Sequence, residues 1–248
     1  MNKKNFIKIN FHKNKIYIKD LFIFSRYLQF HGEEWKTYFM KKYNYFTKII
    51  DLKRDCKNIK KSFGKSAKNQ INRAKKLPIK CGIYDLEQNF KFYKYFIDRF
   101  AKNKNRNFLS YDENLNNDLK KVITFAKYEN QTIVFHTYTV DYESKTAILL
   151  HSASKIREKN IQNDKKLKRV IGYANRYLHY WDMCYFKKMG FKKYDIGGYA
   201  VDTEDEELKK INIFKNDFRG IMIDKSHYES YPLYFSRKIY HILKRKSV

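Results

Sequence analysis

The chain has 248 residues, of which 43% are hydrophobic and 18% aromatic, and its formal net charge is +28. This aromatic content excludes a disordered chain, and the length allows one large domain or two small ones with a sizeable core. The charge fits a polyanionic partner, either nucleic acid or an anionic membrane surface. Codon bias is the alternative explanation, because the amino acids of AT-rich codons (lysine, asparagine, isoleucine, phenylalanine and tyrosine) dominate the composition.

The cysteines and the N-terminus indicate the compartment. The chain has three cysteines, Cys56, Cys81 and Cys184, and no two of them form a C-x-x-C pair. This spacing argues against a disulfide framework or a structural zinc site, so no metal is expected. The basic N-terminus lacks the apolar segment of a secretory signal. The longest apolar stretches fall far short of the ~20 residues that span a bilayer. We therefore expect a cytoplasmic protein, either soluble or peripheral at the inner face of the membrane.

In the first half of the chain, patterns of apolar residues predict strands followed by helices. Alternation predicts a hairpin over residues 5–20 and a strand over residues 45–52. Apolar residues spaced three to four apart predict helices over residues 55–76, 86–102 and 113–128. The first of these helices is rich in lysine on its other faces, which indicates either a solvated surface or a contact with phosphates.

The second half of the chain predicts a strand–crossover–helix–strand unit. Strands are expected over residues 132–140 and 146–152, a polar loop over residues 154–168, a helix over residues 169–189 and a strand over residues 192–197. This order is typical of a mixed sheet flanked by helices. The expected buried stripe of the helix consists of Ile171, Ala174, Leu178, Trp181 and Tyr185.

Three consecutive segments carry a family resemblance. An amphipathic helix (residues 176–190) is followed by a short strand with paired glycines (194–198) and by a Phe-Lys-x-x-Phe-x-Gly signature (214–220). In this order the segments resemble the C-terminal catalytic half of the Fem-type peptidyl and aminoacyl transferases of the GNAT superfamily. The resemblance covers roughly residues 147–228, and a weaker likeness extends over residues 53–76.

The resemblance implies an α/β (α+β) fold with a GNAT-like mixed sheet flanked by helices. The expected organisation is a reduced, diverged N-terminal GNAT-like portion over residues 1–130 and a catalytic GNAT-like portion over residues 131–248, or both in one compact domain.

Three residues are candidates for catalytic roles, and the resemblance implies the role of the first. Lys215 would lie beside the transferred acyl group and stabilise negative charge on a tetrahedral intermediate or a donor phosphate. Asp195 would orient the acceptor amine, with a purely structural role as the alternative. His151, near the end of a preceding strand, is a candidate acid or base, although a lone histidine is more often structural. Arg219 replaces the first glycine of the family's pair, which leaves the local turn and the choice of acceptor open.

A second pattern concerns the donor. The run from Arg169 to Ala174 fits the Arg/Gln-x-x-Gly-x-Gly/Ala pattern of GNAT enzymes, in which small residues let N–H groups at a helix N-terminus approach a pyrophosphate. The glycine pair at the end of a strand either admits another group close to the backbone or forms a simple turn. The expected donor-binding residues are Arg169, Gly172, Ala174, Asn175 and Arg176, and the expected acceptor-binding residues are His179, Gly197, Gly198 and Arg219.

The resulting hypothesis is an acyltransferase with no tightly bound cofactor. It would move an acyl or aminoacyl group from acyl-CoA or aminoacyl-tRNA to an amine or hydroxyl of a cell-envelope sugar or peptidoglycan-type precursor, which is lipid-linked if the protein docks on an anionic membrane. Two alternatives remain open, namely a non-catalytic, basic nucleic-acid-binding protein and an inactive member of the family.

Overall fold

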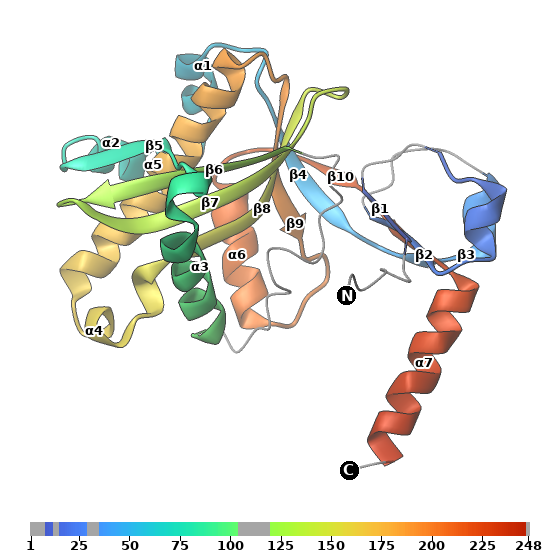
Figure 1. Ribbon diagram of the computed structural model, residues 1–248. Coiled ribbons are helices and arrows are strands. Elements are labelled where there is room, and N and C mark those ends of the chain that lie inside the picture. The colour runs from blue at the N-terminus through green and yellow to red at the C-terminus, as the bar shows by residue number, and fades with distance from the viewer. Residues whose placement is uncertain (1–7, 12–14, 29–34, 104–119, 247–248) are drawn as a thin grey trace. The chain divides into compact units, whose positions relative to one another are not determined.

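The computed structural model describes residues 8–11, 15–28, 35–103 and 120–246 (Figure 1). The contacts of the chain form two compact units, unit 1 with residues 1–47 and 222–248 and unit 2 with residues 48–221. The sequence suggested a division between residues 130 and 131. Strands β6 (Lys120–Tyr128) and β7 (Gln131–Asp141) flank that point, and they pair along their length within unit 2.

A seven-stranded mixed sheet, counted over the described residues, forms the centre of the fold, in the order β10-β4-β9-β8-β7-β6-β5. Strands β5 to β8 pair antiparallel with their neighbours, whereas β8 and β9 pair parallel. The three strands predicted in the second half of the chain therefore lie side by side in one sheet. The remaining strands of this sheet are β4 (Phe46–Asp51), β5 (Ile79–Ile83), β8 (Thr146–Ser154), β9 (Lys193–Tyr199) and β10 (Ile221–Asp224).

Helices cover both faces of this sheet. On β7, the Thr137 hydroxyl lies 2.5 Å from the Tyr93 hydroxyl of α3, whereas His136 and Tyr138 bond to Asp182 of α5. Alternate side chains of a strand point to opposite faces, so α3 and α5 lie on opposite sides of the sheet (Figure 1). The helices of unit 2 are α1 (Cys56–Ser62), α2 (Lys65–Ala74), α3 (Leu86–Lys102), α4 (Lys159–Gln162), α5 (Lys165–Lys188) and α6 (Glu206–Asn216).

Helix α5 packs on the sheet through much of the stripe predicted from its sequence. Ile171, Ala174 and Leu178 are fully buried in one apolar cluster with residues of β6 and β7. Trp181 is only partly buried, and its ring stacks on Tyr185 at a centroid distance of 5.4 Å. The expected packing through Leu178 and Trp181 is confirmed.

The helix predicted over residues 55–76 is in fact two helices, α1 and α2. The backbone is extended at Phe63 and Gly64. Phe63 is buried, and the Gly64 N–H donates to the Asp217 carbonyl at 2.7 Å. A Cβ at Gly64 would lie 2.8 Å from Asp217 Oδ1. This close tertiary contact, which the helical spacing does not reveal, interrupts the helix.

Two further expectations in the first half are wrong. Residues 120–128, predicted as helical, form strand β6, since their β-branched residues pack between two neighbouring strands. The first seven residues of that predicted helix lie outside the described residues. No hairpin forms within the described part of residues 5–20, because β1 (Lys8–Phe11) pairs parallel with β2 (Ser25–Leu28).

The loop predicted over residues 154–168 contains regular structure. It includes the 3-10 helix η3 (Lys155–Arg157), α4 and the first turn of α5. The Asp164 carboxylate caps α5 by accepting the Leu167 N–H at 2.8 Å. Helix α5 therefore begins at Lys165, four residues before the predicted start at Arg169.

Unit 1 has its own four-stranded sheet, with the order β1-β2-β11-β3. Ile16, Tyr27 and Met40 form its small apolar core. Buried Glu229 accepts hydrogen bonds from Arg26 at 3.0 Å and from Tyr43 at 2.8 Å. The other elements of this unit are η1 (Ile18–Leu21), η2 (Trp35–Phe39), β3 (Met40–Tyr43), β11 (His227–Ser230) and α7 (Tyr231–Lys246). Within the described residues, no helix combines the length and the apolar character needed to cross a membrane.

Candidate active site

The candidate site is built where strands β8 and β9 diverge. Their parallel ladder has three pairs and ends at Ile148 and Asp195, although β8 continues to Ser154 and β9 to Tyr199. On its other side β8 contains a bulge, because Thr137 of β7 pairs with His151 while the next residue pairs with Leu149. A bulge re-aims the strand locally and commonly borders a functional site.

Lys215 of α6 lies at this divergence. Its ammonium group donates a hydrogen bond to the Gly198 carbonyl. Burial lowers the pKa of Lys215 to about 8, and the nearby Asp195 carboxylate only partly offsets this shift. Asp195 is fully buried and accepts the Gly197 N–H at 2.8 Å. The structure thus brings together Lys215, Asp195 and the glycine pair, which the sequence assigned to one site.

The backbone at Gly197 has two features that require glycine. Its φ is +82°, in the left-handed region, and a Cβ there would lie 3.1 Å from the Leu149 carbonyl oxygen and 3.7 Å from Lys215 Nζ. The sequence placed the glycine pair at the end of a strand, but β9 continues through both residues to Tyr199. Gly197 therefore keeps the backbone of β8 and the Lys215 side chain close to β9.

The Phe-Lys-x-x-Phe signature positions Lys215. Phe218 is buried against Phe63, with ring centroids 5.1 Å apart, and against His179 at 5.2 Å. Phe214 also contacts the His179 ring, at 5.4 Å. The two phenylalanines thus fix the C-terminal end of α6 against α1 and α5, and the lysine between them is held at the divergence of β8 and β9.

Arg219 follows this signature and has a φ of +56°. A left-handed conformation favours glycine, which is the residue that the family resemblance implies at this position. The local turn therefore forms with arginine in this position, in a backbone conformation that glycine commonly adopts. Its side chain is exposed.

Arg176 places a second cation near Lys215. Its guanidinium lies 4.6 Å from the centroid of the Phe214 ring and pairs with Asp217 at 3.4 Å. Burial lowers the pKa of Arg176. The pKa of His179 lies well below its usual value, mainly because of burial and then because of His136, Lys215 and Arg176. Lys215 and Arg176 thus both lie close enough to His179 to act on its charge, and each has a carboxylate beside it, Asp195 and Asp217 respectively.

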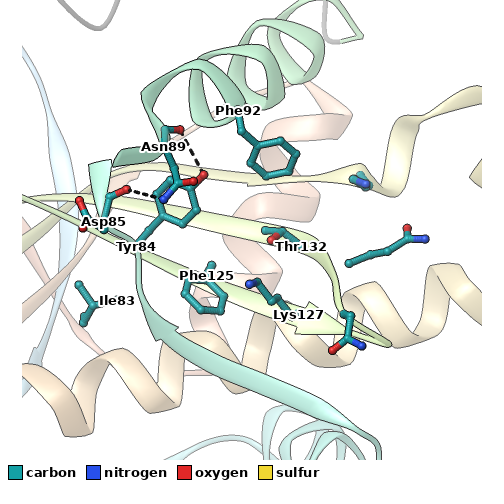
Figure 2. Close-up of a pocket in the computed structure, with 11 residues that line it drawn as sticks. Ile83, Tyr84, Asp85, Asn89, Phe92, Phe125, Lys127 and Thr132 are labelled. Atoms are coloured by element: carbon teal, nitrogen blue, oxygen red, sulfur yellow. Dashed lines mark hydrogen bonds between the residues drawn. The ribbon is translucent and has the colours of Figure 1, made fainter. Parts of the chain in front are cut away.

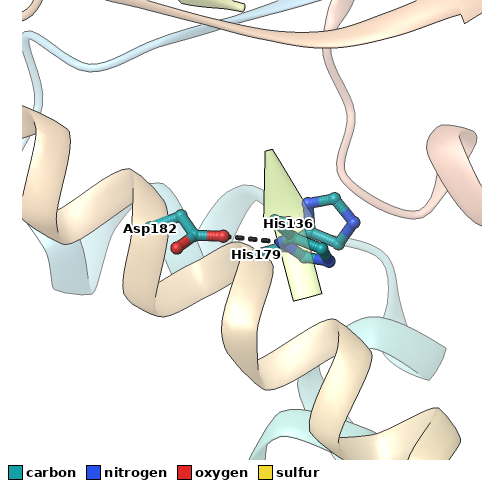
Figure 3. Close-up of side chains that lie close together, drawn as sticks. All are labelled: His136, His179 and Asp182. Carbon is teal, nitrogen blue, oxygen red and sulfur yellow. Dashed lines mark hydrogen bonds and ion pairs between the residues drawn. The ribbon is translucent and has the colours of Figure 1, made fainter. Parts of the chain in front are cut away.

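A buried polar network includes His136, His179 and Asp182 (Figure 3). His136 Nδ1 is 2.7 Å from Asp182 Oδ2, and its Nε2 is 2.8 Å from Asn175 Oδ1. Ser152 also donates to Asn175 Oδ1, at 3.2 Å. His136 and Asp182 are both fully buried, so these bonds satisfy polar groups that would otherwise be costly to bury.

Two tyrosines connect Asp182 to His179. The Tyr138 hydroxyl donates to Asp182 Oδ2 at 2.5 Å and lies 2.8 Å from the Tyr194 hydroxyl, which lies 2.7 Å from His179 Nδ1. Burial raises the pKa of both tyrosines well above 10. The chain of bonds therefore fixes the orientation of the His179 ring.

The sequence indicated part of this network. It assigned Asn175 to donor binding and His179 to acceptor binding, and it gave no role to Asp182. The partners His136, Tyr138 and Tyr194 were missed. The available signal was the alternation in the strands, which places His136 and Tyr138 on the same face of β7.

The same cluster contains the spacing of a metal site. Ligand atoms of His136, His179 and Asp182 lie within 4.8 Å of one another. Both ring nitrogens of His136 and Oδ2 of Asp182 already take part in hydrogen bonds, whereas Asp182 Oδ1 is buried without a hydrogen-bond partner among the described residues. A cation would have to displace this network, so the donor set fits hydrogen bonding better than metal binding.

Other predicted site residues lie elsewhere. His151 pairs with Thr137, so the two side chains share the α3 face of the sheet, opposite Asn175 and His179. Burial lowers its pKa. The run from Arg169 to Ala174 lies inside α5, where backbone N–H groups bond within the helix, and not at its N-terminus. The expectation that a pyrophosphate binds free N–H groups at this position is therefore wrong.

A pocket of about 580 Å³ opens at the β5–β6 edge of the sheet (Figure 2). Tyr84, Phe92 and Phe125 contribute aromatic rings to its lining, and Asn89 and Lys127 contribute polar groups. None of its lining residues belongs to the group around Lys215.

Comparisons with known proteins agree with this architecture. No protein-family model and no curated protein sequence matches the chain. Among solved structures, FemX has a TM-score of 0.59 at 15% identity, covering 76% of this chain and 63% of its own. The C-terminal domain (DUF2156) of a putative lysylphosphatidylglycerol synthetase from Agrobacterium fabrum has a TM-score of 0.54 at 8% identity, covering 84% and 68%.

A conserved protein of unknown function from Bacteroides thetaiotaomicron likewise has a TM-score of 0.54 at 11% identity, covering 84% of this chain and 70% of its own. The chain thus spans about two thirds of the length of these structures. The identities are low, and the likeness establishes the fold, which is the GNAT-like α/β fold expected from the sequence.

Proposed function

We propose that this protein transfers an acyl or aminoacyl group from a carrier to an amine or hydroxyl of a cell-envelope precursor. The observation that carries the proposal is the partly buried ammonium group of Lys215, held by the Gly198 carbonyl at the divergence of β8 and β9. The structural likeness to FemX and to a lysylphosphatidylglycerol synthetase domain supports the same class of chemistry.

The proposed reaction needs orientation and charge stabilisation, and no covalent enzyme intermediate. The acceptor nitrogen or oxygen attacks the carbonyl carbon of the carrier ester or thioester, and the carbonyl oxygen becomes an oxyanion. Lys215 stabilises that oxyanion, and Arg176 is a second cation in the same part of the structure. Collapse of the intermediate breaks the bond to the carrier, which leaves as an alcohol or a thiol after taking up a proton, while the acceptor loses one.

The donor that we favour is an aminoacyl-tRNA. Residues Arg169–Ala174 lie inside α5, so they do not offer the free N–H groups that were expected to bind the pyrophosphate of acyl-CoA. Helix α2 carries exposed basic residues, and Arg73 also bonds to Tyr173 of α5 at 3.0 Å. Burial and, to a smaller extent, the charge of Lys75 lower the pKa of Lys60. Crowded cations of this kind bind a nucleic-acid backbone with strong salt dependence.

The same basic surface favours a second candidate, a non-catalytic nucleic-acid-binding protein. This alternative requires no function for the polar groups around Lys215. Unfolding temperatures measured with aminoacyl-tRNA, uncharged tRNA and acyl-CoA test the choice of donor, because a ligand of the native state raises stability. Stabilisation by acyl-CoA alone would reject the tRNA donor.

Single-turnover transfer from the stabilising donor to a peptidoglycan precursor peptide tests the chemistry. Lys215→Ala is expected to lower the transfer rate about 10²–10³-fold while donor binding remains nearly unchanged. The matched control is Lys210→Ala, because Lys210 is an exposed lysine on the same helix. If transfer is equally fast in both variants, the proposed chemistry is rejected and the binding function moves ahead.

A further inference from the structure

Most of the exposed large apolar side chains among the described residues belong to unit 1, although it is the smaller unit. The longest stretch of them lies on helix α7. Tyr231, Phe235, Ile239 and Ile242 are all exposed, with Phe235 at 53% and Ile239 at 57%. At 3.6 residues per turn, these four positions fall within an arc of about 80°. They form one continuous apolar stripe along the helix.

The beginning of α7 is anchored to its own sheet. Leu233 is 2% exposed, and the Arg237 guanidinium donates to both carboxylate oxygens of Glu229, at 2.9 and 3.1 Å. Farther along the helix, Ile239 and Ile242 are exposed. The ribbon of α7 extends away from the unit 1 sheet (Figure 1). An apolar stripe of this length on an extended helix indicates a binding surface.

The charges of α7 identify the partner. The helix contains five basic residues and no acidic residue. Arg237 and Lys238, which are both exposed, fall within an arc of about 100° that does not overlap the apolar stripe. A helix with an apolar face, a basic face and no acidic residue is typical of helices that lie in the interface of an anionic bilayer.

Two other occupants fit less well. A second copy of α7 would bring five basic residues against five others, which opposes pairing. A nucleic acid would contact the basic arc and leave the apolar stripe in water. An anionic bilayer accommodates both faces at once, since its acyl chains cover apolar side chains and its headgroups pair with the cations.

We infer that α7 is a membrane-docking helix, which lies in the headgroup region of an anionic lipid bilayer with the stripe Tyr231, Phe235, Ile239 and Ile242 facing the acyl chains. None of the four stripe residues belongs to the group around Lys215, so the inference stands or falls independently of the proposed transfer reaction. For that reaction, docking would hold the protein at the surface that presents a lipid-linked acceptor.

The test measures binding of the full chain to phosphatidylcholine vesicles with and without 30 mol% phosphatidylglycerol (about one anionic lipid in three) by flotation. Binding is expected only with the anionic vesicles, and it should weaken as salt rises. The double variant Phe235→Ser/Ile239→Ser keeps the charge and is expected to bind at least about tenfold more weakly. Lys238→Glu is expected to bind at least about fivefold more weakly.

The matched control is Met189→Glu, which places a charge at an exposed apolar residue of unit 2 and should leave binding unchanged. Amide hydrogen exchange of α7 in the wild-type chain gives a readout that needs no variant, because the bilayer should slow exchange there. Absence of binding to anionic vesicles at low salt overturns the inference. Equal losses in the control and the α7 variants, or dimerisation that depends on Phe235 and Ile239 without vesicles, also overturn it.

Discussion

Replacement of Lys215 by methionine should make the protein more stable at neutral pH. Burial lowers the pKa of Lys215 from 10.5 to about 8, so the folded state holds a charge that it solvates poorly. A shift of this size corresponds to about 3 kcal/mol, which is an upper bound because the side chain is only partly buried. The lost bond to the Gly198 carbonyl offsets about 1 kcal/mol, so the expected gain is about 1–2 kcal/mol.

The stability difference between Lys215→Met and wild type should change with pH in a definite direction. Between pH 8 and 10.5 the unfolded chain holds the Lys215 proton and the folded protein releases it, so this group contributes stability that grows as pH rises. This stabilising contribution is complete above the pKa of Lys215 in the unfolded chain, and it is lost as pH falls through the pKa of Lys215 in the folded protein. The advantage of Lys215→Met should therefore be largest near pH 7 and should shrink toward pH 10.

Urea unfolding of wild type and Lys215→Met at several pH values between 7 and 10 measures this difference, since other titrating groups cancel between the two proteins. Lys210→Met controls for the loss of an exposed lysine and should change stability by less than about 0.5 kcal/mol. If Lys215→Met is less stable than wild type at pH 7, or if the difference does not vary with pH, the description of Lys215 as a desolvated ammonium group is wrong.

Four further variants, the last of them compared with wild type over a range of pH, test other parts of the structure by urea unfolding. Gly197→Ala should destabilise by about 1–2 kcal/mol because of its positive φ, and a neutral effect would refute the left-handed backbone. Gly172→Ala, with no heavy atom within 4 Å of the new Cβ, should stabilise α5 by about 0.5–1 kcal/mol. Tyr194→Phe should cost about 1–3 kcal/mol because the buried partners Tyr138 and His179 lose a bond; no loss would contradict the network. Because the pKa of His179 is lowered, stability should fall as pH drops below about 6.5, by up to about 1.4 kcal/mol per unit, and less steeply in His179→Gln.

Local patterns determined β7, β8, β9 and most of α5 in the second half of the chain. The period of the apolar residues in α5 and the buried run of β8 follow directly from sequence, since each element must bury one face. The Phe-Lys-x-x-Phe signature likewise indicated Lys215 from the sequence alone. The expected grouping of Lys215 with Asp195 and the glycine pair agrees with the geometry.

Tertiary contacts decided what these patterns could not. The approach of Gly64 to Asp217 divides one predicted helix into two, and strand pairing converts residues 120–128 from helix to strand. The face on which His151 lies depends on a bulge in β8, because one extra residue reverses the direction of every later side chain. The network of His136, Tyr138 and Tyr194 joins three elements that are distant in sequence, so only the packing of α5 on the sheet brings it together.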